Sequence, residues 1–176
     1  MSMKKVGSIE VYELDENLDK YTRKEREEYI NELFKQEYQG KEISYLLNGE
    51  EIKALINQKT RRNFRAYQHS GKYETKKSYN ARQNIAFSGN YIDMISNTSY
   101  NYSKAESKEH QKRHHKNNRW HYFNKIIKCN NCFYSVNIDV LEKDNNYFIY
   151  NTKLKEVDAP ALNRSMISTS SVINIS

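Results

Sequence analysis

Four of the chain's five histidines lie within a short basic segment, residues 110–121. Imidazole gains and loses a proton near neutral pH, so two histidines can act as general base and general acid. Cleavage of RNA without a metal needs one group to activate the 2′-OH, one to protonate the departing 5′-oxygen, and a cation beside the phosphate. The residue types in this segment therefore predict RNA chemistry.

The candidate acids and bases differ in how firmly the chain could hold them. His121 comes first, because it lies on or just before a predicted strand, and strand residues hold geometry better than loop residues. His115 and His114 are the second candidates. A histidine in so polar a segment is more often a solvated side chain than a catalyst, and residues 59–62 can be a solvated basic turn. The candidate groups for holding or orienting the phosphate are Arg119, Lys59, Lys125, Thr60, Tyr150 and Thr169.

Positive charge is concentrated in the middle of the chain. Residues 59–128 carry 16 Lys and Arg against four Asp and Glu, whereas residues 1–58 and 129–176 are each slightly acidic. Such a zone attracts a polyanion through counterion release, and the 15 tyrosines could stack on unpaired bases. A composition rich in Lys, Asn, Ile and Tyr can also reflect an AT-rich genome. The predicted nucleic-acid contacts are Arg61, Arg62, Arg65, Lys76, Lys77, Lys112, Arg113, Lys116 and Lys125.

The length and the composition limit the class of protein. A chain of 176 residues fits a single domain, 1–176, in which 1–38 forms an N-terminal strand and helix. No apolar run approaches the roughly 20 residues of a membrane span, and the start lacks the apolar segment of a signal peptide. Two cysteines are too few for a disulfide framework, so a reducing compartment is expected. These features predict a cytoplasmic protein without a membrane partner.

The front third has local signals for a strand, a helix and a hairpin. A short strand is expected at 9–14. Thr22 and Glu25 have the spacing of a capping box, which predicts a helix over 22–38 that ends before Gly40. The Asn48-Gly49 pair suits the tight turn of a hairpin over 43–56. The helix is expected to pack through Tyr29, Ile30, Leu33, Phe34 and Tyr38.

The remainder of the chain favours a sheet. Residues 57–84 show no periodicity, a helix is expected around 90–96, and 97–118 is expected to be an exposed loop or a frayed helix. Alternating apolar residues then predict meandering strands, which makes the fold class α+β, with N-terminal helices and a hairpin followed by a C-terminal antiparallel meander. The expected strands are 120–128, 133–141 and 147–154, with a further one at 171–175.

Cys129-Asn-Asn-Cys132 lies between the first two of these strands. A two-residue hairpin turn is required at this point, so the cysteines are expected to flank the turn. Zinc held by the two cysteines with His110 and His114 is an alternative, but the histidines lack the compact context of a zinc finger. A redox pair at a helix N-terminus is disfavoured, because no helix follows. We therefore expect neither a metal nor a cofactor.

Six short motifs follow one another along the chain: Gln39-Gly-Lys-Glu-Ile43, Asn57-Gln-Lys-Thr-Arg61, Gly89-Asn-Tyr-Ile-Asp-Met-Ile95, the block from His114 to Phe123, Tyr134-Ser-Val-Asn-Ile-Asp-Val140 and Ile149-Tyr150. In this order they resemble one of the large polyvalent-protein-associated domains of phage and mobile-element proteins, over roughly 39–176. The late helix followed by a meander is also similar to the barnase, EndoU, colicin and RelE superfamily of metal-independent ribonucleases. The resemblance implies RNA cleavage by groups scattered across a sheet face.

Two functions follow from these observations. The first is a metal-independent endoribonuclease of toxin or effector type, with tRNA as one candidate substrate and an immunity or target protein as a candidate partner. The second is a non-catalytic phage or mobile-element accessory protein that binds RNA or blocks a host nucleic-acid enzyme such as an RNA-guided defence nuclease. The small size and the absence of a delivery segment favour the second. The clustered histidines are unnecessary for charge binding alone, and they favour the ribonuclease.

Overall fold

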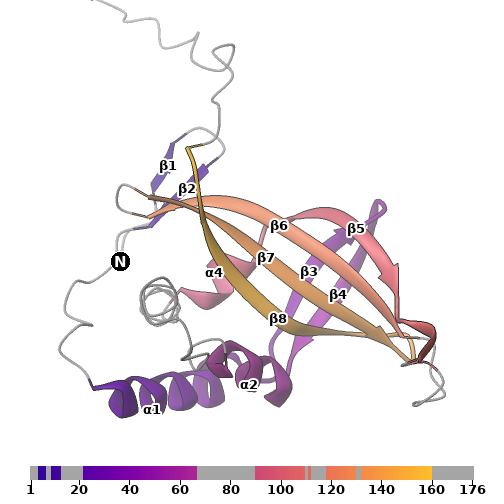
Figure 1. Ribbon diagram of the computed structural model, residues 1–176, viewed down its shortest axis with the longest axis horizontal. Helices are drawn as coiled ribbons and strands as arrows, with labels where there is room; N and C mark the ends of the chain where they lie inside the picture. The colour runs from indigo at the N-terminus through magenta and orange to yellow at the C-terminus, as the bar shows by residue number, and fades with distance from the viewer. Residues whose placement is uncertain are drawn as a thin grey trace, which may run out of the picture.

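A computed structural model describes residues 4–6, 9–12, 22–66, 90–109, 111, 118–129 and 132–159. In these ranges the chain forms one curled, mixed sheet of eight strands, in the order β1-β2-β6-β7-β8-β4-β3, with β5 paired to β6 (Figure 1). The strands are β1 (Lys4–Val6), β2 (Ile9–Tyr12), β3 (Glu42–Leu47), β4 (Glu50–Ile56), β5 (Ser99–Ala105), β6 (Arg119–Cys129), β7 (Cys132–Lys143) and β8 (Asn146–Val157). The strand expected at 171–175 lies outside the described residues.

The α+β class is confirmed, but the sheet is not the antiparallel meander that the sequence predicts. Strands β6, β7 and β8 are antiparallel neighbours, whereas β2 pairs parallel to β6 and β4 pairs parallel to β8. Alternating residues show which face of a strand is buried, but they do not show which distant strand adds to its edge. In the described residues a single α-helix precedes the hairpin, so the plural N-terminal helices of the predicted architecture are not confirmed.

The N-terminal helix begins at the expected cap. The Glu25 backbone N–H donates to Thr22 Oγ1 (3.4 Å), and the Thr22 N–H donates to Glu25 Oε2 (2.7 Å), which starts α1 (Arg23–Leu33). A π-helical turn, η2 (Phe34–Tyr38), continues it. Ile30, Phe34 and Tyr38 are buried as expected, but Tyr29 is 51% exposed. Tyr29 lies at the edge of the apolar stripe of the helix, and side chains at this edge point partly toward solvent.

The hairpin at 43–56 is also confirmed. Strands β3 and β4 pair antiparallel, with Leu47 opposite Glu50. Asn48 and Gly49 have φ values of 53° and 87°, so both central residues of the turn occupy the left-handed region. The Asn-Gly pair tolerates this conformation, which is why it fixes the register of the two strands.

Strand β1, helix α2 and strand β5 were not predicted from the sequence. Helix α2 (Gln58–Ala66) lies where no periodicity was expected, because only Thr60 and Phe64 of its described side chains are buried. Strand β5 lies within the expected loop at 97–118; most of its residues are polar, and it is paired to β6 through its backbone. By contrast, α4 (Tyr91–Ile95) lies where the helix around 90–96 was expected.

The core lies between the inner face of the curled sheet and the helices, which gather on one side of it (Figure 1). The rings of Phe34 and Tyr91 are 4.7 Å apart, and the Tyr91 hydroxyl lies 2.9 Å from Thr152 Oγ1 on β8. The ring centres of Tyr45 on β3 and Phe123 on β6 are 4.6 Å apart, so these two distant strands of the curled sheet are in contact. None of the described helices is long and apolar enough to cross a bilayer.

Candidate functional site

His121 lies at the centre of a chain of hydrogen bonds across three strands. Its Nδ1 is 2.6 Å from Ser103 Oγ on β5, and its Nε2 is 2.8 Å from Glu142 Oε2 on β7. The Tyr100 hydroxyl lies 2.9 Å from the same Ser103 oxygen. An ionised carboxylate can only accept, so Nε2 carries a proton toward Glu142 and Nδ1 is free to accept from the serine hydroxyl. His121 itself is only 3% exposed.

The register of the strands produces this arrangement. Strands β6 and β7 pair from Cys129 opposite Cys132 to Arg119 opposite Glu142. Side chains two residues apart on a strand share a face, so Arg119 and His121 point to the same side of β6. Glu142 and Ser103 were not among the residues predicted from the sequence. A two-residue turn between the cysteines implies the pairing of Arg119 with Glu142, and this signal could have identified the carboxylate.

Four polar side chains lie near the start of β6 and the end of β7, and we call them the Glu142 cluster: Arg119, His121, Glu142 and Tyr147. Arg119 is exposed, the Glu142 side chain is 28% exposed, and Tyr147 is the register partner of Glu142 on β8. The Tyr147 ring lies 5.8 Å from the His121 ring. Burial, and then the charges of Glu142 and Glu50, raise the pKa of Tyr147, so its phenol keeps its proton at neutral pH. The cluster thus combines a carboxylate, a proton donor and a cation.

Lys59 and Thr60 lie at the start of α2, away from His121. Thr60 Oγ1 donates to the Ile149 carbonyl of β8 and accepts from the Asn57 N–H (3.0 Å), so it fastens the helix to the sheet. Lys59 Nζ lies 5.5 Å from the centre of the Tyr150 ring. The Tyr150 ring in turn contacts Trp120, which precedes His121 on β6 and faces the other side of the sheet. Lys59 and His121 are therefore not brought together.

Lys125 is the fixed cation of a buried network. Its Nζ lies 2.5 Å from Glu10 Oε2 and donates to the carbonyls of Asp93 and Ser96, both at 2.8 Å. Both side chains of the ion pair are almost fully buried. These contacts hold the ammonium within the fold, so Lys125 has a structural role. Its contact with nucleic acid or phosphate stays a prediction.

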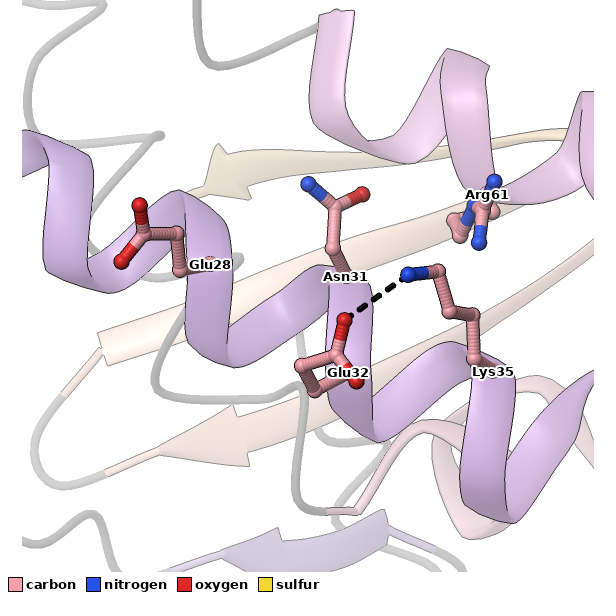
Figure 2. Close-up of a pocket in the computed structure, with 5 residues that line it drawn as sticks. All are labelled: Glu28, Asn31, Glu32, Lys35 and Arg61. Atoms are coloured by element: carbon pink, nitrogen blue, oxygen red, sulfur yellow. Dashed lines mark hydrogen bonds and ion pairs between the residues drawn. The ribbon is translucent and has the colours of Figure 1, made fainter.

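Arg61 of α2 lies beside α1. Arg61 faces Glu28, Asn31, Glu32 and Lys35 across a hollow of about 440 Å³ (Figure 2). Lys35 Nζ is 2.8 Å from Glu32 Oε1, and the two acidic and two basic side chains around the hollow leave it without a preference for an anion. Arg62 is exposed, and only the backbone of Arg65 is described. Their contacts with nucleic acid stay predictions.

The remaining candidates lie outside the described residues. No structure is therefore assigned to the two histidines that were the second candidates, to the basic residues around them or to the lysines before α4. Their roles stay predictions. These residues are His114, His115, Lys112, Arg113, Lys116, Lys76, Lys77 and Thr169.

The cysteines are register partners at the end of the β6–β7 hairpin, and both are free thiols. Burial, and then the neighbouring Cys132, raise the pKa of Cys129 to about 11, so its thiol stays protonated at neutral pH. A protonated thiol is neither a good nucleophile nor a metal ligand. Within the described ranges, no group of three or more His, Cys, Asp and Glu side chains is placed to hold a metal ion.

We expect that protein purified without added zinc contains none, and that EDTA leaves its unfolding midpoint unchanged. The reason is that strand pairing, which needs only the backbone, holds the two cysteines together. Metal analysis and thermal unfolding with and without the chelator measure this. Stoichiometric zinc, or a lower midpoint in EDTA, would show that the cysteines hold a metal with histidines from outside the described residues.

Comparison with known proteins finds no family model, no curated protein and no solved structure that matches this chain.

Proposed function

We propose that the chain is a metal-independent endoribonuclease whose base is Glu142. The observation that carries this proposal is the hydrogen bond from His121 Nε2 to Glu142 Oε2, at 2.8 Å. Glu142 is the partner in this bond that reaches solvent, whereas His121 is buried behind it. His121, the leading candidate from the sequence, is therefore assigned as a positioning residue that orients the carboxylate.

The chemistry follows from the groups of the Glu142 cluster. Glu142 takes the proton of a 2′-OH, and the freed oxygen attacks the adjacent phosphorus. Arg119, exposed at the start of β6, neutralises charge on the phosphate. Tyr147 gives its proton to the departing 5′-oxygen and regains one from Glu142 after the step. The products are a 2′,3′-cyclic phosphate and a 5′-hydroxyl, and no activated water is needed.

Incubation of the purified protein with total RNA in EDTA tests this proposal. We expect RNA fragments to accumulate with time, because none of the proposed groups depends on a divalent cation. A tRNA fraction incubated in parallel tests whether tRNA, the candidate substrate of a ribonuclease of toxin or effector type, is cleaved. RNA that remains intact at a stoichiometric amount of folded protein would reject the proposed cleavage.

A non-catalytic accessory protein is the second candidate. The observation that favours it is that both ring nitrogens of His121 already have protein partners, so the hydrogen bonds can simply tie β5, β6 and β7 together. Such a protein would bind RNA or inhibit a host nucleic-acid enzyme, with an RNA-guided defence nuclease as one target. Wild-type protein that binds RNA, or inhibits such an enzyme, without cleaving RNA would support this candidate.

A further inference from the structure

Four aromatic side chains lie on the face of the sheet opposite to His121 and Phe123. Phe123 and His121 point into the core from β6, so Trp120 and Tyr122, which alternate with them, point outward. Tyr102 of β5 stacks on Tyr122, with ring centres 4.5 Å apart and planes inclined by 21°. The Tyr150 ring of β8 meets Trp120 edge to face at 4.8 Å. We call Tyr102, Trp120, Tyr122 and Tyr150 the outer aromatic face.

Part of this face is open to solvent. Tyr102 is 50% exposed. A large aromatic ring is more often used to fill a core or an interface, so its exposure here leaves a surface on which a ligand can pack. Burial, and then the charge of Asp139, raise the pKa of Tyr122, so its ring stays neutral beside Tyr102. Two neutral stacked rings, one of them half exposed, form a flat apolar platform on the outer side of β5 and β6.

Cations surround the aromatic side chains. Lys59 Nζ lies 5.5 Å from the centre of the Tyr150 ring, at one wall of a cavity of about 290 Å³ that Lys143 and Asp144 also line. Lys104, the register partner of Trp120, is exposed on β5. Asp139 of β7 is a second carboxylate on this face, and Lys153 pairs with it at 2.7 Å. In the described part of this surface, lysines therefore outnumber carboxylates.

We propose that the outer aromatic face binds unpaired bases of single-stranded RNA by stacking, while the surrounding lysines contact the phosphates. Exposed rings combined with lysines suit single strands, because every base has a flat face and every nucleotide has a negative charge. A duplex keeps its bases stacked inside and offers this face only its backbone. The proposal rests on the proposed function for the identity of the ligand as RNA, and it names the substrate class as unpaired RNA.

The face also adjoins the Glu142 cluster. Trp120 follows Arg119 directly at the start of β6, and Glu142 lies opposite Arg119 on β7. RNA that lies on Trp120 and passes over this end of the sheet comes close to Glu142. The stacked bases thus anchor the strand on one face of the sheet, and the scissile phosphate reaches the other face around the end of the strands.

Trp120 is the only tryptophan of the chain, so its fluorescence reports binding at this face. The probe is a single-stranded 2′-O-methyl oligonucleotide, which lacks the attacking hydroxyl and so separates binding from cleavage. We expect saturable quenching of Trp120 by this strand, a steep loss of affinity as salt rises, and much weaker binding of the matching duplex. Absence of quenching, or equal affinity for the duplex, would overturn the proposal.

Two tyrosines of equal exposure provide matched variants. Tyr102→Ala is expected to weaken binding by about 5- to 150-fold, the range for loss of one base-stacking aromatic side chain. Tyr29→Ala, on α1 and 51% exposed, is expected to bind as wild type. Lys59→Ala is expected to reduce the dependence of affinity on salt, whereas Lys24→Ala on α1 leaves it unchanged. If Tyr102→Ala binds as tightly as Tyr29→Ala, stacking on this face is rejected.

The outcomes separate this inference from the proposed function. Quenching by the single strand in a protein that never cleaves RNA would support the binding face and reject the ribonuclease. Cleavage of RNA by a protein whose Tyr102→Ala variant binds normally would support the ribonuclease and reject the binding face.

Discussion

Replacing Glu142 by glutamine is expected to lower the rate of RNA cleavage by about 10²- to 10⁴-fold, the usual contribution of a general acid or base. The glutamine amide cannot take the proton of the 2′-OH. Its oxygen can still accept from His121 Nε2, so the hydrogen bond across β6 and β7 has a replacement. Single-turnover rates in EDTA measure the chemical step, and the unfolding midpoint shows whether the variant remains folded.

Two controls distinguish a chemical role from a structural one. Glu51→Gln removes an exposed carboxylate from β4 and is expected to leave the rate unchanged. His121→Ala should lower kcat with little change in KM, because a positioning residue acts through Glu142 and not on the substrate. His121→Gln, which keeps an N–H for Glu142, should recover part of the loss. Glu142→Gln with the wild-type rate, in a folded protein, would exclude Glu142 as the base.

Replacing Lys125 by methionine is expected to lower the free energy of unfolding by about 3 to 5 kcal/mol, which is the usual cost of removing one partner of a buried ion pair. The Glu10 carboxylate, 2.5 Å from the ammonium, would lose its ion-pair partner in a buried site. The carbonyls of Asp93 and Ser96 would also lose a donor. Urea unfolding at neutral pH measures the difference from the wild type.

A second lysine on the same strand provides the matched control. Lys128 lies three residues further along β6, with its Nζ 5.6 Å from the centre of the Phe133 ring, and Lys128→Met should cost less than about 1 kcal/mol. Adding Glu10→Gln to Lys125→Met should recover part of the stability, because the uncompensated charge is removed. Equal losses for Lys125→Met and Lys128→Met would contradict the structural role of Lys125.

Local signals predicted the local structure well. The capping box at Thr22 and Glu25 and the turn at Asn48-Gly49 are found as expected, because each depends on residues within one turn of chain. Strand β5 and helix α2 were missed, since each has few buried side chains and depends on contacts with distant strands. The parallel pairings of β2 and β4 join strands far apart in sequence, so no local pattern indicates them.

The candidate site was predicted in part. The sequence identified His121 and Arg119, which share a face of β6, but it did not show that packing would bury His121 behind Glu142. Lys59 was grouped with these residues by type, although its neighbour Tyr150 lies on the other face of the sheet. Residue type indicates possible chemistry, whereas alternation along β6 and the register between strands decide which groups meet.

The most direct measurement of the central claim is the chemistry of the RNA ends. Wild-type protein is incubated in EDTA with a ribo-oligonucleotide and, in parallel, with its 2′-O-methyl counterpart. We predict cleavage of the first alone, with 2′,3′-cyclic phosphate and 5′-hydroxyl ends, because attack by the neighbouring hydroxyl needs no metal. Cleavage of the 2′-O-methyl strand, ends with a 5′-phosphate, or no cleavage of either strand would contradict the assignment of Glu142 and its neighbours as a ribonuclease site.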